Sequence, residues 1–223
     1  MNKNFSGILF DLDGTLLDTA PEFEYALKRV LQEEKKNSPL SSQAVRIAVN
    51  HGIEGLIHLG FQIYPTDPNY TILSQRLLAH YFTELGQHSI LFPGIIECLS
   101  QLNHHDIPWG IVTNKPEKYT LALVKTMPDL QQAKIIVSGD TLEHAKPHPA
   151  PLQYACKKMQ LKPNTMLYVG DAQRDMQAAR AAGMPCVLAR YGYLSPQDTT
   201  HSWGANYHID HADQLLSIII SSY

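Results

Sequence analysis

A short apolar segment that ends in two carboxylates constrains the fold of this chain more than any other feature. Residues 8–10 are Ile-Leu-Phe, and they run directly into Asp11-Leu12-Asp13-Gly14-Thr15. A brief apolar run followed by a glycine turn predicts a buried strand. Because residues two apart on a strand point to the same side, Asp11 and Asp13 are expected to face one point at its end. Such a pair repels itself and favours a cation, although an aspartate-rich turn that caps a helix has the same composition.

The composition is typical of a globular chain with one large domain, or with a core and a smaller insert. Of the 223 residues, 44% are hydrophobic and 17% charged, so a well-filled core needs no disulfide. The net charge of −3 gives no electrostatic footprint for nucleic acid. No apolar run approaches the roughly 18–20 residues that span a bilayer, and the N-terminus lacks the pattern of a secretory signal. We therefore expect no nucleic-acid partner, no membrane association and a cytoplasmic location.

Three widely spaced cysteines agree with that location. Cys98, Cys156 and Cys186 include no pair with the spacing of metal ligands. We interpret them as small core residues of a protein in a reducing compartment.

The order of the segments predicts a helical insert within a sheet protein. Helical patterns without a convincing strand run from about residue 21 to residue 91, and Pro21 suits a first turn capped by Asp18 or Thr19. From residue 92 onward helices alternate with short apolar segments, which predict strands at 109–113, 134–137, 166–169 and 186–188 and a marginal one at 207–209. This alternation is typical of a parallel, doubly wound sheet, which binds ligands beyond the carboxyl ends of its strands.

Polar residues follow the predicted strands at that edge. Besides the first pair of aspartates, the segments are Thr113-Asn114-Lys115, Ala145-Lys146-Pro147 and Gly170-Asp171 with Asp175. Each alone is common, because helix caps and solvated lysines have the same letters. Together they place three polar strand ends and a cation at the predicted binding edge.

These segments resemble the four motifs of the haloacid dehalogenase superfamily, in the right order and across the whole chain. Within the superfamily, the helical insert makes the chain most similar to the phosphoglycolate phosphatase branch. The resemblance implies an α/β fold with a Rossmann-like doubly wound parallel sheet. Its catalytic core would comprise residues 1–17 and 92–223, and residues 18–91 would form an all-helical cap inserted after the first strand.

The resemblance also implies roles for individual residues. Asp11 would be the nucleophile that carries the phosphoryl group, and Asp13 the general acid and base. The phosphoryl oxygens would be held by Thr113, Asn114 and Lys146. The implied cofactor is Mg²⁺, with ligands from Asp11, the backbone carbonyl of Asp13 and Asp171, and with Asp175 orienting metal-bound water.

Substrate contacts are expected from the insert. Arg46, His51 and Gly52 lie in its best candidate segment, where a glycine turn could present amides and Arg46 could meet a carboxylate. An exposed arginine and a plain helix break explain the same letters equally well. Tyr191-Gly192-Tyr193, after a predicted strand, could also line the pocket.

The resemblance implies a magnesium-dependent phosphomonoesterase that acts on a small phosphorylated metabolite, with phosphoglycolate as the leading substrate. Asp13 favours phosphate chemistry over dehalogenation, because a halide leaving group needs no proton. Residues 109–115, 139–141, 174–175 and 191–193 also resemble the bacterial N-acetylmuramic acid 6-phosphate phosphatases. A sugar-phosphate mutase and a non-enzymatic sensor of phosphate ligands are further alternatives. The sequence leaves open whether the protein is a monomer or a homodimer.

Overall fold

A six-stranded parallel sheet forms the centre of the molecule. The computed structural model describes residues 2–3, 5–36 and 39–221. Strand order across the sheet is β6-β5-β2-β7-β8-β9, and every neighbouring pair is parallel. The strands are β2 (Gly7–Phe10), β5 (Trp109–Val112), β6 (Ile136–Val137), β7 (Met166–Gly170), β8 (Cys186–Ala189) and β9 (Tyr207–Ile209). The predicted fold class and the marginal last strand are thus confirmed.

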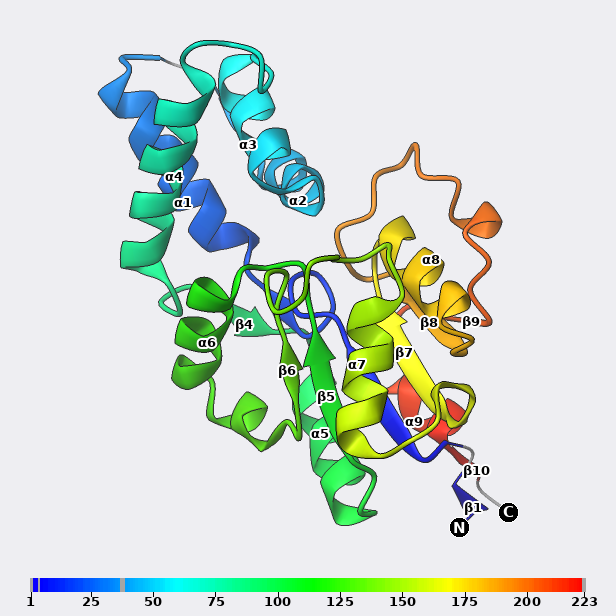
Figure 1. Cartoon of the computed structure of the whole chain (residues 1–223). Coiled ribbons are helices and arrows are strands. Elements are labelled where there is room, and N and C mark those ends of the chain that lie inside the picture. Colours follow the sequence, from blue (N-terminus) through cyan, green and yellow to red (C-terminus); the bar gives the residue numbers. More distant parts are fainter. Residues whose placement is uncertain (1, 4, 37–38, 222–223) are drawn as a thin grey trace.

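Helices cover both faces of the sheet, so its strands are apolar on both sides (Figure 1). Ile8 and Phe10 pack toward one face, with α5 (Ile95–His104), α6 (Glu117–Thr126) and α9 (Gln214–Ile219). Leu9 packs toward the other face, with α7 (Ala150–Met159) and α8 (Gln173–Ala181). This burial explains why β2 is an unbroken apolar run instead of an alternating one.

The four helices α1–α4, here called the insert helices, pack on one another beyond one edge of the sheet (Figure 1). They are α1 (Ala20–Glu33), α2 (Ser42–Asn50), α3 (Gly52–Phe61) and α4 (Tyr70–Glu84). Their core includes the stacked rings of Phe23 and Tyr81, whose centroids are 4.0 Å apart. The predicted helical insert is therefore present, and it has an apolar core of its own.

Two short strands join the insert helices to the rest of the molecule. β3 (Leu17–Asp18) pairs antiparallel with β4 (Ile90–Leu91). The expectation that residues 21–91 contain no strand is wrong at β4, because a two-residue strand carries no periodicity that a sequence could show. A second such pair, β1 (Asn2–Lys3) with β10 (Ile220–Ser221), was also not predicted.

The start of α1 confirms the predicted cap position in part. Thr19 occupies the N-cap position of α1, with Pro21 in the first turn, but its side chain makes no capping bond. Its Oγ1 donates instead to Oδ1 of Asp13 at 2.6 Å. At α2, Oγ of Ser41 accepts from the N–H of Ala44 at 3.1 Å, as an N-cap does.

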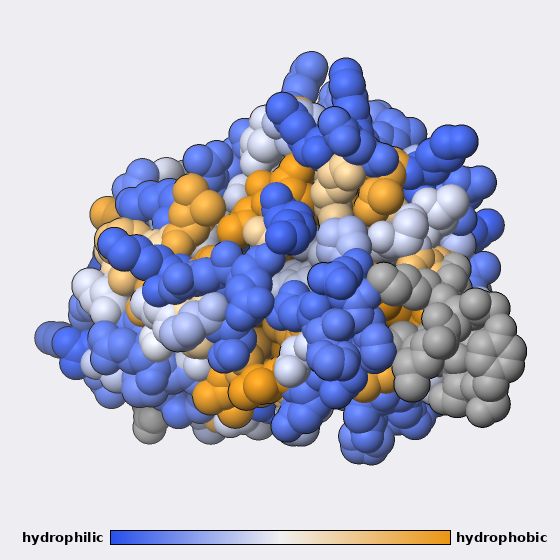
Figure 2. Space-filling view, turned by 90° about the horizontal axis from the view of Figure 1, so that it is seen from below, coloured by the Kyte–Doolittle hydropathy of each residue, from blue (hydrophilic) through white to orange (hydrophobic). Residues whose placement is uncertain are grey.

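The remaining elements are three 3₁₀ helices, η1 (Pro128–Gln132), η2 (Pro163–Thr165) and η3 (Thr200–Ser202). The three cysteines are buried and unpaired, as expected of core residues. Seen from below, the surface is mostly hydrophilic, and its apolar patches are separated by polar side chains (Figure 2). Within the described ranges, no helix combines the length and apolar character needed to cross a membrane.

Candidate active site

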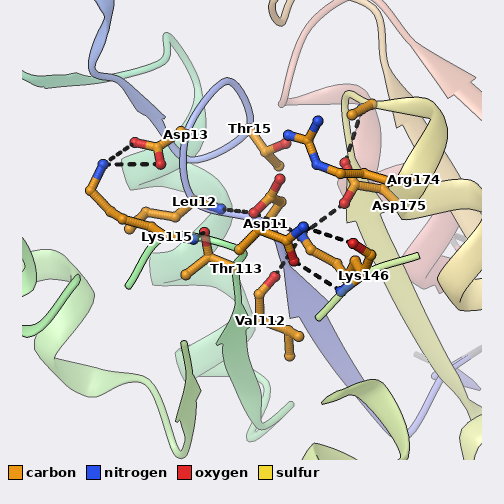
Figure 3. Close-up of polar contacts among 12 residues, drawn as sticks. Asp11, Leu12, Asp13, Thr15, Val112, Thr113, Lys115, Lys146, Arg174 and Asp175 are labelled. Atoms are coloured by element: carbon orange, nitrogen blue, oxygen red, sulfur yellow. Dashed lines mark hydrogen bonds and ion pairs between the residues drawn. The ribbon is translucent and has the colours of Figure 1, made fainter. Parts of the chain in front are cut away.

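Three strand ends and the start of α8 meet at one edge of the sheet (Figure 3). Asp11 follows β2, Thr113 follows β5 and Asp171 follows β7. α8 adds Asp175 from its first turn, where Oδ2 accepts from the N–H of Ala172 at 2.9 Å and fixes the side chain. Because β2 lies between β5 and β7, it places Asp11 near the middle of this edge.

Lys146 forms ion pairs with two of these carboxylates. Its Nζ lies 2.9 Å from Oδ1 of Asp11 and 2.7 Å from Oδ1 of Asp175, and its side chain has no exposed surface. Nζ also donates to the carbonyl of Val112 at 2.9 Å and to the hydroxyl of Tyr168 at 2.7 Å. The buried ammonium group of Lys146 therefore has polar partners that compensate its loss of water, as a stable buried ion pair requires.

Asp11, Asp171 and Asp175 form a buried carboxylate cluster whose oxygens lie within 4.8 Å of one another. Burial and the charges of its neighbours raise the pKa of Asp171 to about 8. Burial raises the pKa of Asp11 to about 6, against the opposing effect of Lys146. For Asp175 burial acts in the same direction, but Lys146 and Arg174 hold its pKa below the usual value. Burial and the neighbouring carboxylates thus make it unfavourable for all three groups to be ionised together.

The donor set fits a hard divalent cation. All three side chains offer carboxylate oxygens, which Mg²⁺ prefers. The raised pKa values of Asp11 and Asp171 come first from burial of the charged groups and then from neighbouring carboxylates, and a bound cation would offset both effects. Asp171 is held in place for this by Thr15, whose hydroxyl donates to Oδ1 at 3.3 Å, and by the N–H of Tyr193, which donates to Oδ2 at 2.8 Å.

Asp11 and Asp13 are held by different lysines. The chain turns at Gly14, where φ is 82°, and Asp13 points to Lys115 while Asp11 points to Lys146 (Figure 3). Nζ of Lys115 lies 2.9 and 3.0 Å from the two carboxylate oxygens of Asp13. Both aspartates line the same cavity, as expected, but they have different partners because the strand ends at Phe10 and its alternation does not extend through the turn.

Sequence reasoning missed Lys115 as a site residue. Its side chain is 4% exposed, and Nζ lies 4.9 Å from the ring centroid of Tyr81 and 5.2 Å from that of Phe23. Lys115 thus contacts both Asp13, at the end of β2, and the aromatic rings of α1 and α4 in the insert. Its place directly after Thr113-Asn114 was the only signal, and a lysine there is more often solvated.

The predicted phosphate-binding residues differ in what they contact. Thr113 lies at the end of β5, and its Oγ1 accepts from the N–H of Lys115 at 3.2 Å. Asn114 bonds the backbone of Lys146 at both ends of its amide, with Nδ2 donating to the carbonyl at 2.8 Å and Oδ1 accepting from the N–H at 3.0 Å. Asn114 therefore anchors the loop that carries the buried lysine.

A cavity of about 510 Å³ lies between the strand ends and the insert helices. Asp11, Asp13, Thr113 and Asn114 line its polar end, and aromatic and aliphatic side chains from α1, α3 and α4 line much of the rest. His51 and Gly52, which were predicted to contact substrate, also line it. Arg46 is not among the lining residues, and its Nη2 forms an ion pair with Asp18.

The turn after β8 contributes two further groups. Tyr193 lines the cavity, as predicted for its segment. At Gly192 a Cβ would lie 2.4 Å from the carbonyl oxygen of Gly14 and 2.4 Å from Cβ of Asp171. Only glycine fits this position, and it allows the backbone of the turn after β8 to pack closely against Asp171 of the carboxylate cluster. Arg174, on α8, also lines the cavity.

Comparison with known proteins places this geometry in a family. Residues 8–189 match the family model described as haloacid dehalogenase-like hydrolase. An N-acetylmuramic acid 6-phosphate phosphatase of Pseudomonas putida is 33% identical, over 96% of each chain. A phosphoglycolate phosphatase of Xanthomonas campestris is 35% identical, over 93% of each chain. The crystal structure of a predicted phosphoglycolate phosphatase from Haemophilus somnus superimposes with a TM-score of 0.85 at 27% identity, covering 98% of this chain and 99% of that one. This chain belongs to the haloacid dehalogenase-like hydrolase family.

Proposed function

We propose that the protein is a magnesium-dependent phosphomonoesterase that works through an aspartyl-phosphate on Asp11. The observation that carries this proposal is the buried cluster of Asp11, Asp171 and Asp175 at the central strand end, where Lys146 forms ion pairs with Asp11 and Asp175. A structural ion pair needs one carboxylate for one lysine, and a third buried carboxylate has no use in it. Relatives named as phosphatases support the same chemistry.

Asp11 is suited to attack a phosphoryl group because its rotamer is fixed. Oδ1 accepts from the N–H of Leu12 at 2.8 Å and contacts Lys146 at 2.9 Å. Asp11 and Asp171, with the backbone carbonyl of Asp13, would hold Mg²⁺, and Asp175 would orient its water. When bound, the ion removes the repulsion between a carboxylate and a phosphate dianion.

The same edge can bind the transferred group. Thr113 lines the cavity near Asp11, where it and nearby backbone N–H groups would hold the phosphoryl oxygens, and Lys146 supplies positive charge next to Asp11. Asn114 supports this set by holding the Lys146 backbone. Fixed donors of this kind stabilise charge that develops on the phosphoryl oxygens.

Asp13 is positioned to move the proton. It would protonate the leaving oxygen and then take a proton from the water that hydrolyses the aspartyl-phosphate. Lys115 and Thr19 orient its carboxylate, which also lines the cavity. The two aspartates thus have separate lysines for separate steps.

We further propose that residues 18–91 act as a cap over a core formed by residues 1–17 and 92–223. The short β3–β4 pair is the hinge, and closure of the insert helices excludes water from the cavity. Arg46 would stabilise the hinge through Asp18, so its predicted meeting with a substrate carboxylate is not part of this proposal.

Phosphoglycolate is the leading substrate, and the cavity gives a reason to keep a second. Its volume of about 510 Å³ exceeds what a two-carbon acid occupies, and its lining is rich in aromatic and aliphatic groups. A larger ester such as N-acetylmuramic acid 6-phosphate uses this space better, and a relative of that name covers 96% of the chain. A small phosphorylated metabolite as partner and a cytoplasmic location complete the proposal.

Phosphate release from p-nitrophenyl phosphate and from both candidate esters tests the proposal, with Mg²⁺ and with a chelator. Asp11→Asn is expected to lower kcat by on the order of 10⁴-fold or more, since it removes the nucleophile. The matched control is Asp129→Asn, which changes an exposed aspartate in η1. Activity that survives either the chelator or Asp11→Asn would refute the mechanism. Isomerisation of a sugar phosphate with little free phosphate would identify a mutase instead.

A further inference from the structure

The positive charge of Lys146 is already shared between two carboxylates, since it forms ion pairs with Asp11 and Asp175. With a divalent ion bound among the ionised carboxylates of Asp11, Asp171 and Asp175, the cluster and Lys146 together would be close to neutral. A phosphate dianion would then arrive without a counter-charge. A further cation of the protein at this place would therefore favour phosphate binding.

Arg174 lies at the same end of the cavity. Its half-buried side chain extends from the first turn of α8 toward the side of the site where Thr15 and Asp11 lie (Figure 3). Arg174 lines the cavity, as do Asp11 and Thr113. A ligand that contacts Asp11 from the cavity is therefore close to the guanidinium as well.

Three carboxylates act on Arg174 without contacting it. Burial alone would lower its pKa, but the charges of Asp175, Asp11 and Asp171 raise it. Among the residues that the structure describes, none of the three forms an ion pair with the guanidinium. Their negative charge thus holds a cation near the cluster, and its hydrogen-bond donors are not used by the cluster.

Asn50 occupies one nitrogen of the guanidinium and leaves the opposite edge available. Nη1 donates to the carbonyl of Asn50 at 2.7 Å and to its Oδ1 at 2.9 Å. Nε is buried without a partner, and in the described part of the chain no acceptor binds Nη2. The edge formed by Nε and Nη2 is the one with which an arginine binds two oxygens of a phosphate at once. A buried donor without an acceptor is unfavourable, so this edge favours an acceptor from outside the chain.

The bond to Asn50 makes the position of Arg174 depend on the insert helices. Asn50 is the last residue of α2, whose last turn has no basic residue of its own. A guanidinium at that carbonyl interacts favourably with the negative end of the helix. Nδ2 of Asn50 also donates to the carbonyl of Tyr193 at 3.3 Å, so Asn50 is held to the turn after β8 as well. Asn50 is thus fixed where it can orient the guanidinium.

We propose that Arg174 is a second cation of the phosphoryl site: Nε and Nη2 bind two oxygens of the transferred phosphoryl group, and Asn50 positions them. The proposal rests on the phosphatase activity proposed above and adds a catalytic residue to it. Lys146 acts beside the attacking carboxylate of Asp11, whereas Arg174 acts on the phosphoryl oxygens. Two fixed N–H donors stabilise the charge on these oxygens during the transfer.

The affinity for inorganic phosphate measures this role without turnover. In titration calorimetry with Mg²⁺ present, Arg174→Gln is expected to raise the Kd for phosphate about 10- to 100-fold, the effect of losing hydrogen bonds to a charged group. Arg174→Lys keeps the charge but loses the paired donors, so a smaller rise is expected. The matched control, Arg180→Gln, changes an exposed arginine on the same helix and should leave the Kd unchanged. Wild-type phosphate affinity in both Arg174 variants would mean that Arg174 only offsets the charge of the carboxylates, which overturns the proposal.

Steady-state kinetics locate the contact on the substrate. Arg174→Gln is expected to lower kcat about 10²- to 10³-fold, as the loss of a donor to transition-state charge does. The factor should be the same for p-nitrophenyl phosphate and for alkyl phosphates, because the phosphoryl group is common to all of them. A loss confined to one class of leaving group would place Arg174 at the leaving group and contradict the proposal.

Asn50→Ala tests the positioning. It removes the Oδ1 contact but keeps the backbone carbonyl, so kcat is expected to fall only about 3- to 10-fold. In the double variant with Arg174→Gln, the loss should be close to that of Arg174→Gln alone, because one residue acts through the other. Losses that multiply would show that Asn50 acts independently, which refutes its part in the proposal.

The two proposals fail in different ways. If the wild-type protein hydrolyses no ester, p-nitrophenyl phosphate included, the phosphatase is refuted and this proposal with it. If it hydrolyses esters while the Arg174 variants keep the wild-type kcat and phosphate affinity, only this proposal fails. Should Arg174→Gln fold poorly, Arg174→Lys retains the positive charge and decides the question by the same two measurements.

Discussion

At the scale of single residues, the two aspartates of the first strand end are separated by the lysines that hold them. Lys146 lies below Asp11 with no exposed surface, whereas Lys115 holds Asp13 beneath the rings of Phe23 and Tyr81. A carboxylate that attacks phosphorus and one that transfers a proton must be oriented differently. The ion pairs with two fixed lysines set these two orientations.

Lys115→Met tests the role of the second lysine. The change keeps much of the side-chain volume but leaves Asp13 without its ion pair, so kcat is expected to fall about 10- to 100-fold for alkyl phosphates. For p-nitrophenyl phosphate the fall should be smaller, because p-nitrophenolate leaves with little help from an acid. The measurement is kcat for a series of esters with different leaving-group pKa.

Lys118→Met is the control for this series, since Lys118 is an exposed lysine on α6. It is expected to leave the dependence on the leaving group unchanged. An equal loss on all esters in Lys115→Met would mean that Lys115 does not act through the proton transfer of Asp13.

The buried cysteines give a second prediction at this scale. Burial raises the pKa of Cys98 to about 12 and that of Cys156 to about 11. At about pH 8 both thiols are protonated in the folded state, and thiols react as thiolates. Ellman's reagent is therefore expected to react with them on the timescale of unfolding, and at once in guanidinium chloride. Rapid reaction of these two thiols in the native protein would contradict the structure.

The sequence could predict the meeting of Asp11, Asp171, Asp175 and Lys146, because parallel strands bring their ends to one edge whatever the loops do. It could not predict that Lys115 contacts Asp13 or that Arg174 contacts Asn50. Both contacts depend on how the insert helices lie over that edge, and this packing is set by many small contacts that no local pattern shows. The ion pair of Arg46 with Asp18 could not be predicted for the same reason, since Asp18 lies 28 positions earlier.

At the scale of elements, the turn after β8 organises the entry to α1. The hydroxyl of Tyr193 accepts from the N–H of Thr19 at 2.7 Å and from that of Ala20 at 3.0 Å, and it donates to Oδ1 of Asp18 at 2.9 Å. One side chain thereby satisfies the first N–H groups of α1, which explains how Thr19 can use its own hydroxyl on Asp13.

Tyr193→Phe is therefore expected to destabilise the fold by about 1–3 kcal/mol, because it leaves buried N–H groups without an acceptor. Chemical denaturation measures the change. Tyr207→Phe, on the partly exposed strand β9, is the control and should have little effect. A Tyr193→Phe protein as stable as the wild type would show that water replaces the hydroxyl.

The elements that the sequence did not predict are the shortest ones. Helices and strands with four or more apolar positions were found within a few residues of their bounds, whereas β3 and β4 have two residues each. Their pairing depends on the insert helices returning the chain to residue 90, so it is a consequence of tertiary structure. A periodic signal cannot exist in two residues.

At the scale of the whole molecule, the carboxylate cluster links stability to pH and to metal. The pKa of Asp171 is about 8 in the folded protein, against an ordinary value of 3.8. Below about pH 4 it is protonated in both states and contributes nothing. As the pH rises toward 8, only the unfolded state loses the proton, so the metal-free fold is expected to lose stability over this range.

Thermal unfolding with chelator and with Mg²⁺ measures this linkage. The rise in Tm on adding Mg²⁺ is expected to be larger at about pH 8 than at about pH 5, where the ion must displace bound protons. Asp171→Asn should reduce both the metal effect and its pH dependence, and Asp129→Asn is the control for the substitution. A metal effect that does not change with pH would contradict a shared proton and metal site.

The central position of β2 has a consequence for how the protein is made. Its neighbours pair Phe10 with Ile111 on one side and with Val169 on the other. On the ribosome, the insert helices, which lie within residues 20–84, are synthesised completely before either neighbour exists. Local helical contacts form early and long-range strand pairs form late, so the insert helices are expected to fold while β2 is still unpaired. The site that begins at residue 11 is therefore among the last parts of a nascent chain to be built.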